Sequence, residues 1–321
     1  MESRTARFSD GEPDPTERGR MLVSVCICTH NRLADVQEGL GALVPQLDPA
    51  VAEILLVDSA SRREVHDTLL SVTSGIACVR LIRLERPGLS VARNAAVAAA
   101  RGRWIAFLDD DAVPFPDYFA ALCTTIARLE PDVAVFGGRL KPRWPAGARG
   151  VGARWSQLLS LIDDTAERET ELGMIYGANI VYRRDVLARL TEPFDRNLGR
   201  IGRCLLSGEE LGLHLQLSEW GYRALFVGSV GAEHKVPAER LRLRWLRERA
   251  FWQGITLVAV LRGKDGPLPR GARVSWQLLK IVALAPRLLV SDRDRDAYIR
   301  IWQSLGVLRA RLAGVPRGTG A

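Results

Sequence analysis

The stretch Trp104–Asp111 reads WIAFLDDD, five apolar residues followed at once by three carboxylates. An unbroken apolar run of this length predicts a β-strand that is buried on both faces, which is typical of parallel sheets covered by helices. Three adjacent carboxylates repel one another and are costly to hold together unless a cation compensates their charge. The stretch therefore predicts a buried strand that delivers an acidic cluster to the edge of a sheet.

Further strands and helices alternate on the N-terminal side of this stretch. The predicted strands are Val23–Thr29 (VSVCICT), Ala52–Asp58 (AEILLVD) and Val79–Leu84, and the predicted helices are Leu33–Val44 and Ser90–Arg101. Gly102 follows the second helix and is expected to end it as a left-handed cap. Buried strands separated by helices predict an α/β fold with a mostly parallel sheet flanked by helices.

The pattern loosens after residue 140 and becomes helical in the last quarter. The predicted elements are a strand at Ala178–Tyr182, a helix beginning near Glu209, strands at Ala224–Val227 and Gly231–His234, and helices at Arg240–Leu261, Ala272–Leu289 and Asp294–Leu312. We therefore expect a disordered leader over residues 1–20, an α/β domain over residues 21–237 and a basic helical region over residues 238–321.

Composition and charge restrict the class of protein. With 47% apolar and 26% charged residues, the chain is not a disordered protein, and five thinly spread cysteines do not form a disulfide scaffold. Few cysteines, no apolar signal segment and no run of about 18 apolar residues predict a cytoplasmic protein without a membrane span. The net charge is +12 from Lys235 onward and −4 before it. The basic last quarter is therefore expected to face something anionic.

Polar side chains follow the predicted strands at the edge where parallel sheets bind ligands. Thr29, His30 and Arg32 follow the first strand, Asp58 ends the second, and the aspartate triplet ends the fourth. In extended chain, Asp109 and Asp111 would point one way and Asp110 the other. Carboxylates together with phosphate oxygens are the ligands that Mg²⁺ prefers, so we expect a metal–phosphate site here rather than a solvated acidic turn. No glycine-rich dinucleotide loop or P-loop follows the first strand.

These segments resemble, in order, the motifs of the family 2 glycosyltransferases of the GT-A fold. The resemblance covers about Val23 to Trp252. It rests on Val25–Arg32 (VCICTHNR), Leu55–Ser59 (LLVDS), Gly88–Ala95 (GLSVARNA), Ile105–Asp111 (IAFLDDD), Gly177-Ala178-Asn179, Gly208-Glu209-Glu210 and His234. It implies a GT-A domain over residues 21–237 that binds a nucleotide sugar, with UDP as the expected nucleotide, and a divalent cation, Mn²⁺ or Mg²⁺.

The resemblance also implies a role for each matched residue. His30 would lie against the nucleotide base, Asp58 would accept a hydrogen bond from that base, Arg93 would lie near the diphosphate or ribose, and Asp110 would face the ribose. Thr29 and Arg32 belong to the same nucleotide-sugar site. Asp109, Asp111 and His234 would bind the metal, and Gly177, Asn179 and Trp252 would lie on the acceptor side.

The glutamate pair is where the chain departs from the family. The family usually has Glu-Asp, with the aspartate as catalytic base, and that aspartate matches Glu210. Glutamate has similar basicity, which leaves either Glu209 or Glu210 as the base. A carboxylate that takes a proton from the acceptor hydroxyl, with no second nucleophile, implies a single displacement with inversion. The alternative interpretation of the pair is an acidic helix N-terminus.

The basic C-terminal region predicts a second binding surface. Arg240, Arg244 and Arg247 have the spacing of one helical stripe, which is either a solvated face or an interfacial contact with anionic lipid outside the metal site. Phe251-Trp252-Gln253-Gly254 resembles the W-x-x-G segment with which family members close the site. Nucleic acid is not an expected partner because no recognition motif accompanies the charge. We expect a cytoplasmic protein, with peripheral contact at the inner membrane face as a further option.

Two other functions compete with the sugar transferase. A nucleotidyltransferase on a related fold would also use carboxylates and a metal, but it normally needs a glycine-rich basic loop after the first strand. A non-catalytic GT-A domain could be held at a membrane by its basic tail, although the aspartate triplet and the glutamate pair argue against it. The acceptor is open between a glycan, a lipid-linked sugar and a natural-product hydroxyl.

Overall fold

The computed structural model describes residues 21–148, 150–171, 174–200, 204–262, 270–290 and 294–316, so the predicted leader lies outside the described residues. The strands are β1 (Val23–Thr29), β2 (Ala52–Ser59), β3 (Val79–Leu84), β4 (Trp104–Leu108), β5 (Ala112–Pro114), β6 (Val133–Arg143), β7 (Glu167–Thr170), β8 (Asn179–Arg183) and β9 (Arg223–Lys235). The α-helices are α1 (Leu33–Leu43), α2 (Arg63–Thr73), α3 (Leu89–Ala99), α4 (Tyr118–Ile126), α5 (Ala153–Leu158), α6 (Arg184–Leu187), α7 (Glu209–Glu219), α8 (Leu243–Val260), α9 (Arg270–Val290) and α10 (Arg295–Ala313), and the 3₁₀ turns are η2 (Val44–Gln46) and η4 (Ala238–Leu241).

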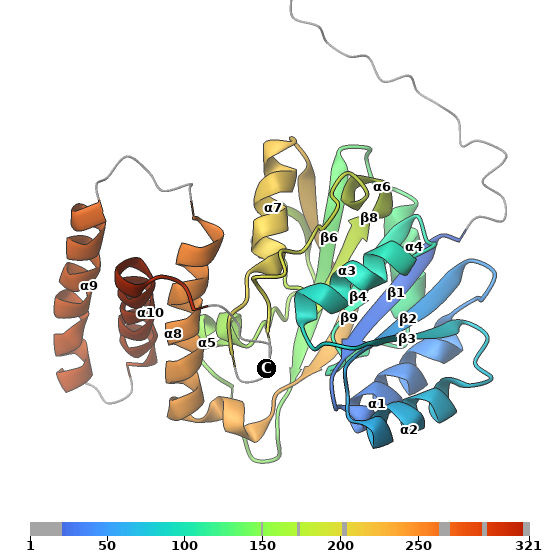
Figure 1. Ribbon diagram of the computed structural model, residues 1–321, viewed down its shortest axis with the longest axis horizontal. Coiled ribbons are helices and arrows are strands. Elements are labelled where there is room, and N and C mark those ends of the chain that lie inside the picture. The colour runs from blue at the N-terminus through green and yellow to red at the C-terminus, as the bar shows by residue number, and fades with distance from the viewer. Residues whose placement is uncertain are drawn as a thin grey trace, which may run out of the picture.

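One mixed sheet organises the N-terminal two-thirds of the molecule (Figure 1). Its order is β3-β2-β1-β4-β8-β6-β9-β5, with β7 paired to β9. The four strands from β3 to β4 are parallel, as predicted, whereas β8 runs antiparallel to both β4 and β6. Because β8 is reversed, it begins where β4 ends, with Asn179 opposite Leu108. This reversal brings the segment before β8 to the aspartate triplet.

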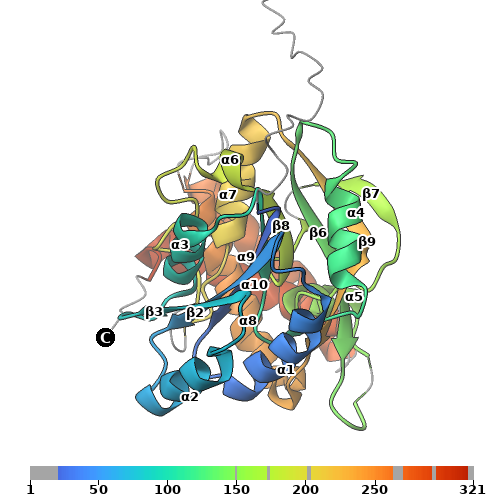
Figure 2. The same cartoon turned by 90° about the vertical axis from the view of Figure 1, so that its right-hand side faces the viewer.

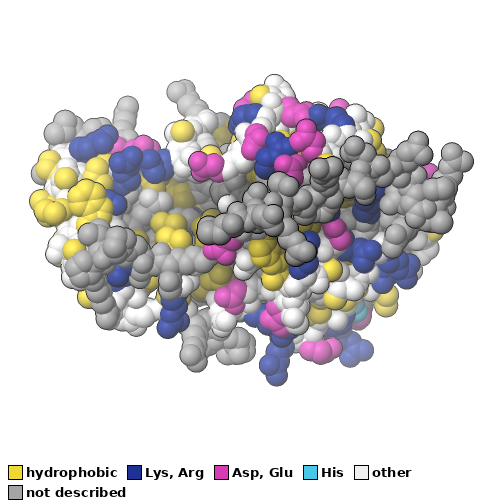
Figure 3. Space-filling view, turned by 90° about the horizontal axis from the view of Figure 1, so that it is seen from above, with side chains coloured by type: hydrophobic (Ala, Val, Ile, Leu, Met, Phe, Trp, Pro, Cys, Tyr) yellow, Lys and Arg dark blue, Asp and Glu magenta, His cyan; other side chains and the backbone are white. Residues whose placement is uncertain are grey.

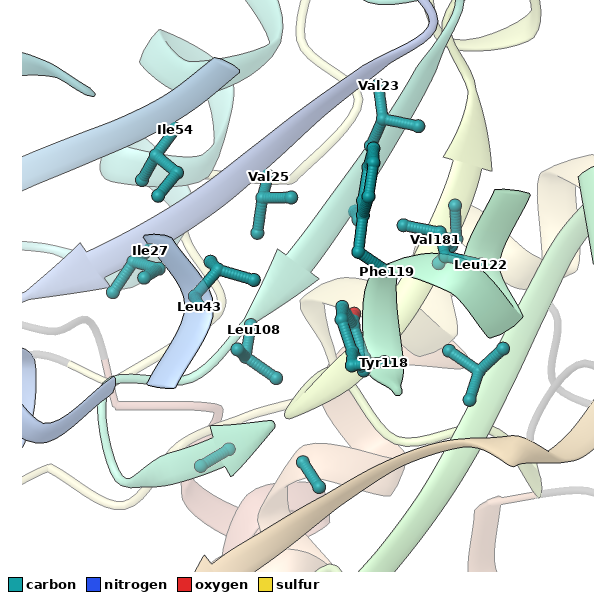
Figure 4. Close-up of a cluster of buried hydrophobic side chains, with 14 of the residues drawn as sticks. Val23, Val25, Ile27, Leu43, Ile54, Leu108, Tyr118, Phe119, Leu122 and Val181 are labelled. Atoms are coloured by element: carbon teal, nitrogen blue, oxygen red, sulfur yellow. The ribbon is translucent and has the colours of Figure 1, made fainter. Parts of the chain in front are cut away.

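The two faces of the sheet are buried under different helices (Figures 1 and 2). Val25 and Ile27 of β1 pack with the apolar faces of α1, α2 and α4, as the close-up in Figure 4 shows for α1 and α4. Cys26, between them, faces the opposite side, where α3, α6 and α7 pack. Alternate residues of one strand thus enter two cores, which explains why the strand is apolar throughout.

The structure corrects the sequence analysis at two places in this domain. Helix α3 ends at Ala99, and Gly102 is not a left-handed cap. Gly102 is needed because a Cβ there would lie 2.4 Å from the Ser24 amide nitrogen of β1. The two short strands predicted near the end of the domain are one strand, β9, whose pairing with β6 shifts register near Gly138. A bulge of this kind interrupts the sequence pattern without ending the strand.

The last quarter is helical, as predicted, and α8, α10 and α9 lie side by side at one end of the molecule (Figure 1). Helices α8 and α10 cross closely at two glycines. A Cβ on Gly254 would lie 2.0 Å from the carbonyl oxygen of Gln303, and one on Gly306 would lie 1.9 Å from that of Phe251. Gly254 of the predicted site-closing segment therefore serves helix packing. No helix among the described residues is long and apolar enough to span a membrane.

Candidate active site

A cavity of about 650 Å³ opens at the carboxyl ends of β1 and β4 and is walled on its far side by α8. Most of the predicted site residues line it, and these are Thr29, His30, Arg32, Arg93, Asp109, Asp110, Asp111, Gly177, Glu209 and Glu210. His234 is buried next to the cavity and contacts Asp111. The sheet topology thus brings together in space residues that are up to about two hundred positions apart in sequence.

The three aspartates form a turn rather than extended chain, because the Ala112 amide donates a hydrogen bond to the Asp109 carbonyl oxygen at 3.0 Å. The extended geometry behind the predicted alternation is therefore wrong, although Asp109 and Asp111 still come together and Asp110 is not part of their group. Arg32 Nη1 lies 3.0 Å from Asp110 and 2.7 Å from Asp111, so both carboxylates share one guanidinium. The Thr29 hydroxyl donates to Asp110 at 2.8 Å. The residues predicted for the nucleotide site thus bind the acidic turn itself.

Asp110 and Asp111 differ in how their charge is compensated. Burial, together with the negative charge of Asp111, raises the pKa of Asp110 to about 7 even though Arg32 opposes it. Burial alone would raise the pKa of Asp111 too, but its hydrogen bond to His234 and the charges of Arg240 and Arg32 hold that pKa well below its usual range. Asp111 therefore stays ionised at neutral pH, as a metal ligand must.

Asp109, Asp111 and His234 suit a divalent cation. Each offers one ligand atom, and these atoms all lie within 4.8 Å of one another. His234 Nε2 lies 3.1 Å from Asp111, and its other ring nitrogen, Nδ1, is buried with no partner among the described residues. Two carboxylates and one imidazole are ligands that Mn²⁺ accepts, and phosphate oxygens can fill further positions. The donor set therefore fits the predicted metal.

Arg93 joins the acidic turn to the glutamate pair. It is 2% exposed, and its guanidinium lies 3.5 Å from Asp109, 3.1 Å from Glu209 and 2.6 Å from Glu210. Its Nη2 also donates to the Gly177 carbonyl oxygen at 3.3 Å. A Cβ on Gly177 would lie 1.8 Å from the nearer Glu210 oxygen, so only glycine allows this approach. Arg93 is thereby surrounded by carboxylates that hold its charge in place.

The two glutamates begin α7, whose N-cap Gly208 has a φ of 96° that favours glycine. Burial and the charge of its neighbour raise the pKa of Glu209 to about 7. Burial acts on Glu210 too, but the charge and hydrogen bond of Arg93 lower the pKa of Glu210 below its ordinary value. The Glu209 side chain is 2% exposed and that of Glu210 is 19% exposed. Glu210 is thus the carboxylate that is both ionised and open to the cavity.

Of the two residues predicted to lie at the nucleotide base, one lines the cavity and the other does not. His30 is exposed and lines the cavity, and its Nδ1 lies 2.7 Å from the Ser59 carbonyl oxygen. Asp58 is fully buried and does not line the cavity. Its oxygens lie 2.8 Å from His66 Nδ1 and 3.0 Å from Arg83 Nη1, and one accepts from the Ser61 amide. In this arrangement Asp58 supports the loop after β2 rather than facing the cavity.

Two residues predicted for the acceptor side do not line the cavity. Asn179 is fully buried, accepts a hydrogen bond from Tyr118 and donates one to the Val230 carbonyl oxygen, so it links β8 to β9. Trp252 packs against a core to which α8, α10 and the segment before α7 contribute. Asn179, the first residue of β8, is fixed by sheet pairing, and Trp252 is partly buried against the cluster that includes Leu206 and Ile255.

The residues that α8 contributes to the cavity were not predicted from the sequence. These are Trp245, Arg249, Gln253 and Thr256, which recur at helical spacing and form one face of α8. The predicted position of Arg240 is wrong as well: Arg240 lies in η4 before α8, is buried, and reaches Asp111 at 3.4 Å. Arg240 is therefore not part of an exposed stripe with Arg244. Residues 245, 249, 253 and 256 have helical spacing in the sequence, but no sequence pattern indicates which face of the helix lines the cavity.

Comparison with solved structures places the architecture in a known fold class. A mannosyltransferase, PcManGT from Pyrobaculum calidifontis, solved with GDP-Man and Mn²⁺, superposes with a TM-score of 0.62 at 19% identity over 96% of this chain and 91% of that one. GalNAc-T7, solved with UDP, GalNAc and Mn²⁺, superposes with a TM-score of 0.54 at 17% identity over 78% of this chain and 52% of that one. The fold is GT-A, that of nucleotide-sugar glycosyltransferases.

The chain belongs to glycosyl transferase family 2, whose family model matches residues 24–191, more than half of the sequence. A glucosyl-dolichyl phosphate glucuronosyltransferase of Haloferax volcanii is 28% identical over 73% of this chain and 75% of its own length. The succinoglycan biosynthesis protein ExoM of Rhizobium meliloti is 26% identical over 82% and 81%. The protein is thus a glycosyltransferase, which removes the nucleotidyltransferase alternative.

Proposed function

We propose that this protein is a metal-dependent, inverting glycosyltransferase that moves a sugar from a nucleotide sugar to an acceptor hydroxyl. One observation carries the proposal: in a single cavity, Arg93 connects the metal-binding group at Asp109 to the ionised carboxylate of Glu210. A metal site and a general base joined in this way are what a sugar transfer from a diphosphate requires, because one end must stabilise the leaving group and the other must activate the acceptor.

Asp109, Asp111 and His234 would hold the cation, which supplies positive charge to the departing diphosphate. Arg32 and Arg240 both reach Asp111, so their guanidinium groups lie where they can bind diphosphate oxygens alongside the metal. His30 lines the cavity beyond β1, and we expect it to lie against the nucleotide base. These contacts orient the donor with its diphosphate over the acidic turn.

Glu210 is the proposed catalytic base. Its pKa is lowered by Arg93, so it is ionised at neutral pH, and it is the more exposed of the two glutamates. Glu209 is buried, with Oε2 lacking a partner among the described residues. We infer that Glu209 positions Arg93 while Glu210 accepts the acceptor's proton. A base on one side of the donor and the diphosphate on the other gives one in-line displacement, and hence inversion.

For the donor we propose a nucleoside diphosphate sugar, with UDP as the first nucleotide to test. The solved structures of this fold described above contain GDP-Man or UDP, each together with Mn²⁺, which supports the class of donor without deciding the nucleotide base. For the acceptor we propose a lipid-linked sugar. The support is the similarity to a transferase named for glucosyl-dolichyl phosphate.

We further propose peripheral contact with an anionic membrane at its cytoplasmic face, through α9. The exposed apolar side chains of α9 are Trp276 (56% exposed), Leu278 (51%), Leu279 (61%) and Val282 (69%). Lys280 lies 5.4 Å from the Trp276 ring and adds positive charge to the same surface. Figure 3 shows hydrophobic side chains beside Lys and Arg at the end of the molecule where α9 lies. An apolar helical face with basic residues is typical of interfacial helices.

A thermal-shift panel tests the proposed function. UDP-, GDP-, dTDP- and CMP-sugars are added with and without Mn²⁺, and one nucleotide series is expected to raise the melting temperature only when Mn²⁺ is present. Dependence on the metal follows because the anionic diphosphate can approach Asp109 and Asp111 only through a cation held between them. No metal-dependent shift with any of the four series would contradict the proposal.

A further inference from the structure

Arg249 of α8 is a buried cation for which the described residues supply no hydrogen-bond partner at Nε or Nη1. Its side chain lines the cavity, the residue is 7% exposed, and both Nε and Nη1 lack a hydrogen-bond partner among the described residues. Burying a charge without a partner is expensive, and native structures retain such groups where another molecule completes the contacts. The two unused nitrogens therefore indicate a ligand that is anionic and reaches the wall of the cavity formed by α8.

The surroundings of Arg249 are basic on one side. Burial and the nearby positive charges of Arg200 and Arg240 lower the pKa of Arg249 to about 9, although the charges of Glu209 and Glu210 act the other way. Arg249 thus remains a cation at neutral pH. Arg200 and Arg240 line the same cavity. Three guanidinium groups around one space offer several donors in the fork geometry that matches phosphate oxygens.

The position of Arg249 separates it from the metal. Among its charged neighbours are the two glutamates that begin α7, whereas the neighbours of Arg240 include Asp111, Arg32 and Asp109. Arg240 therefore belongs to the diphosphate end of the cavity, and Arg249 lies nearer the proposed base. We therefore infer that a group bound by Arg249 belongs to the acceptor, the molecule whose hydroxyl gives its proton to Glu210.

We propose that Arg249 and Arg200, with Arg240 at the side of the metal site, form a subsite for a phosphate group of the acceptor. This inference rests on the proposed transferase function and specifies its acceptor class as a phosphate ester. Helix α8 builds the subsite by presenting Trp245, Arg249 and Gln253 on one face, while its Gly254 packs against α10. The phosphate satisfies the two unpartnered nitrogens of Arg249 and fixes the acceptor beside Glu210.

The test is calorimetric binding of inorganic phosphate, with Mg²⁺ and saturating nucleoside diphosphate present so that the donor site is filled. Ionic strength is matched with chloride. Wild-type protein is expected to bind phosphate, and Arg249→Met is expected to weaken that binding by at least about tenfold, the worth of a charged hydrogen bond or two. Arg244→Met is the matched control, because Arg244 lies on the same helix and its side chain is 84% exposed. It should bind phosphate as the wild type does.

A stability measurement distinguishes this from a structural role. The ligand-free Arg249→Met protein is expected to melt no lower than wild type, because it loses an unpaired buried charge. If Arg249→Met does not fold, Arg249→Lys replaces it in the test. Lysine keeps the positive charge but lacks the paired donors of the guanidinium group, so this variant is expected to bind phosphate more weakly than wild type. Unchanged phosphate affinity in the variant that folds, or equal losses at Arg249 and Arg244, would overturn the subsite.

Competition with the nucleotide gives the remaining outcomes. Phosphate binding that saturating nucleoside diphosphate abolishes would assign Arg249 to the donor and overturn the acceptor assignment. If no nucleoside diphosphate binds with metal, the proposed function fails. The phosphate titration of the nucleotide-free protein then still decides whether Arg249 binds an anion.

Discussion

Arg93 is the residue on which the two halves of the site depend. It is 2% exposed at the edge of the cavity, with its guanidinium 5.6 Å from the centroids of both the Phe107 and Phe194 rings and within ion-pair distance of Asp109, Glu209 and Glu210. Aromatic walls hold the plane of the guanidinium while the carboxylates balance its charge. A lysine could supply the charge but not the several donors that reach different partners at once.

Replacement of Glu210 tests the assignment of the base. Glu210→Gln is expected to cut turnover by roughly 10² to 10⁴, the usual worth of a positioned general base, while donor affinity stays near wild type. Glutamine keeps the shape of the side chain and loses its basicity. Steady-state kinetics and nucleotide titration measure the two effects. Glu209→Gln is the matched comparison, and a larger loss of turnover in that variant would move the base to Glu209.

The raised pKa of Glu209 predicts how stability depends on pH. A carboxyl that titrates near pH 7 in the folded protein and near pH 4.5 when unfolded binds its proton more tightly in the fold. Its contribution to stability is therefore present below about pH 4.5 and is lost as pH rises to about 7. Relative to Glu209→Gln, wild-type melting temperature is expected to fall between pH 5 and pH 7 and then level off. A difference that is constant over this range would contradict the burial of an acid here.

At the scale of elements, strands β1 to β4 and the three C-terminal helices could be predicted because their apolar runs are long and regular. The direction of β8 could not, since no local pattern tells a parallel strand from an antiparallel one. The role of Gly102 was misassigned for a similar reason: sequence shows a glycine after a helix, whereas the need for it comes from Ser24 on another strand. A close approach between residues that are far apart in the sequence leaves no local sequence pattern.

Helix α9 carries the prediction on membrane contact. Trp276→Glu together with Leu279→Glu is expected to abolish co-sedimentation with vesicles of anionic lipid. Each change replaces an apolar side chain that would insert into the membrane with a carboxylate that anionic lipid repels. Binding of wild-type protein to anionic vesicles should exceed binding to neutral ones. The control replaces Arg244 and Arg247 with Gln on α8, which leaves the apolar face of α9 intact.

Wild-type protein that does not bind anionic vesicles at low salt would refute the membrane proposal. Self-association through the same face is the other outcome of this experiment. Analytical ultracentrifugation reports it directly, because the Trp276→Glu and Leu279→Glu protein would then become smaller than wild type in the absence of lipid.

For the molecule as a whole, most of the site could be predicted because family motifs mark the ends of strands. Of those residues, the aspartate triplet, Arg93 and the glutamate pair do meet in one cavity. Most of the wall formed by α8 could not be predicted, because only Gln253 belongs to a quoted motif and the neighbours of the other residues depend on how the helices pack on the domain. Arg240 shows the difficulty: its spacing placed it with Arg244 on a surface, and the 3₁₀ turn instead directs it to Asp111.

The central claim is that this cavity binds a nucleoside diphosphate through a metal held by Asp109, Asp111 and His234. Calorimetric titration of UDP, or of the nucleotide selected by the thermal-shift panel, with and without Mn²⁺, into wild-type protein, Asp111→Asn and the control Asp117→Asn tests it most directly. Asp117 is exposed and lies only six residues away. We expect Mn²⁺ to strengthen nucleotide binding in wild type and Asp117→Asn by at least about tenfold, and Asp111→Asn to lose that gain. A Mn²⁺-dependent gain that survives in Asp111→Asn would contradict the account.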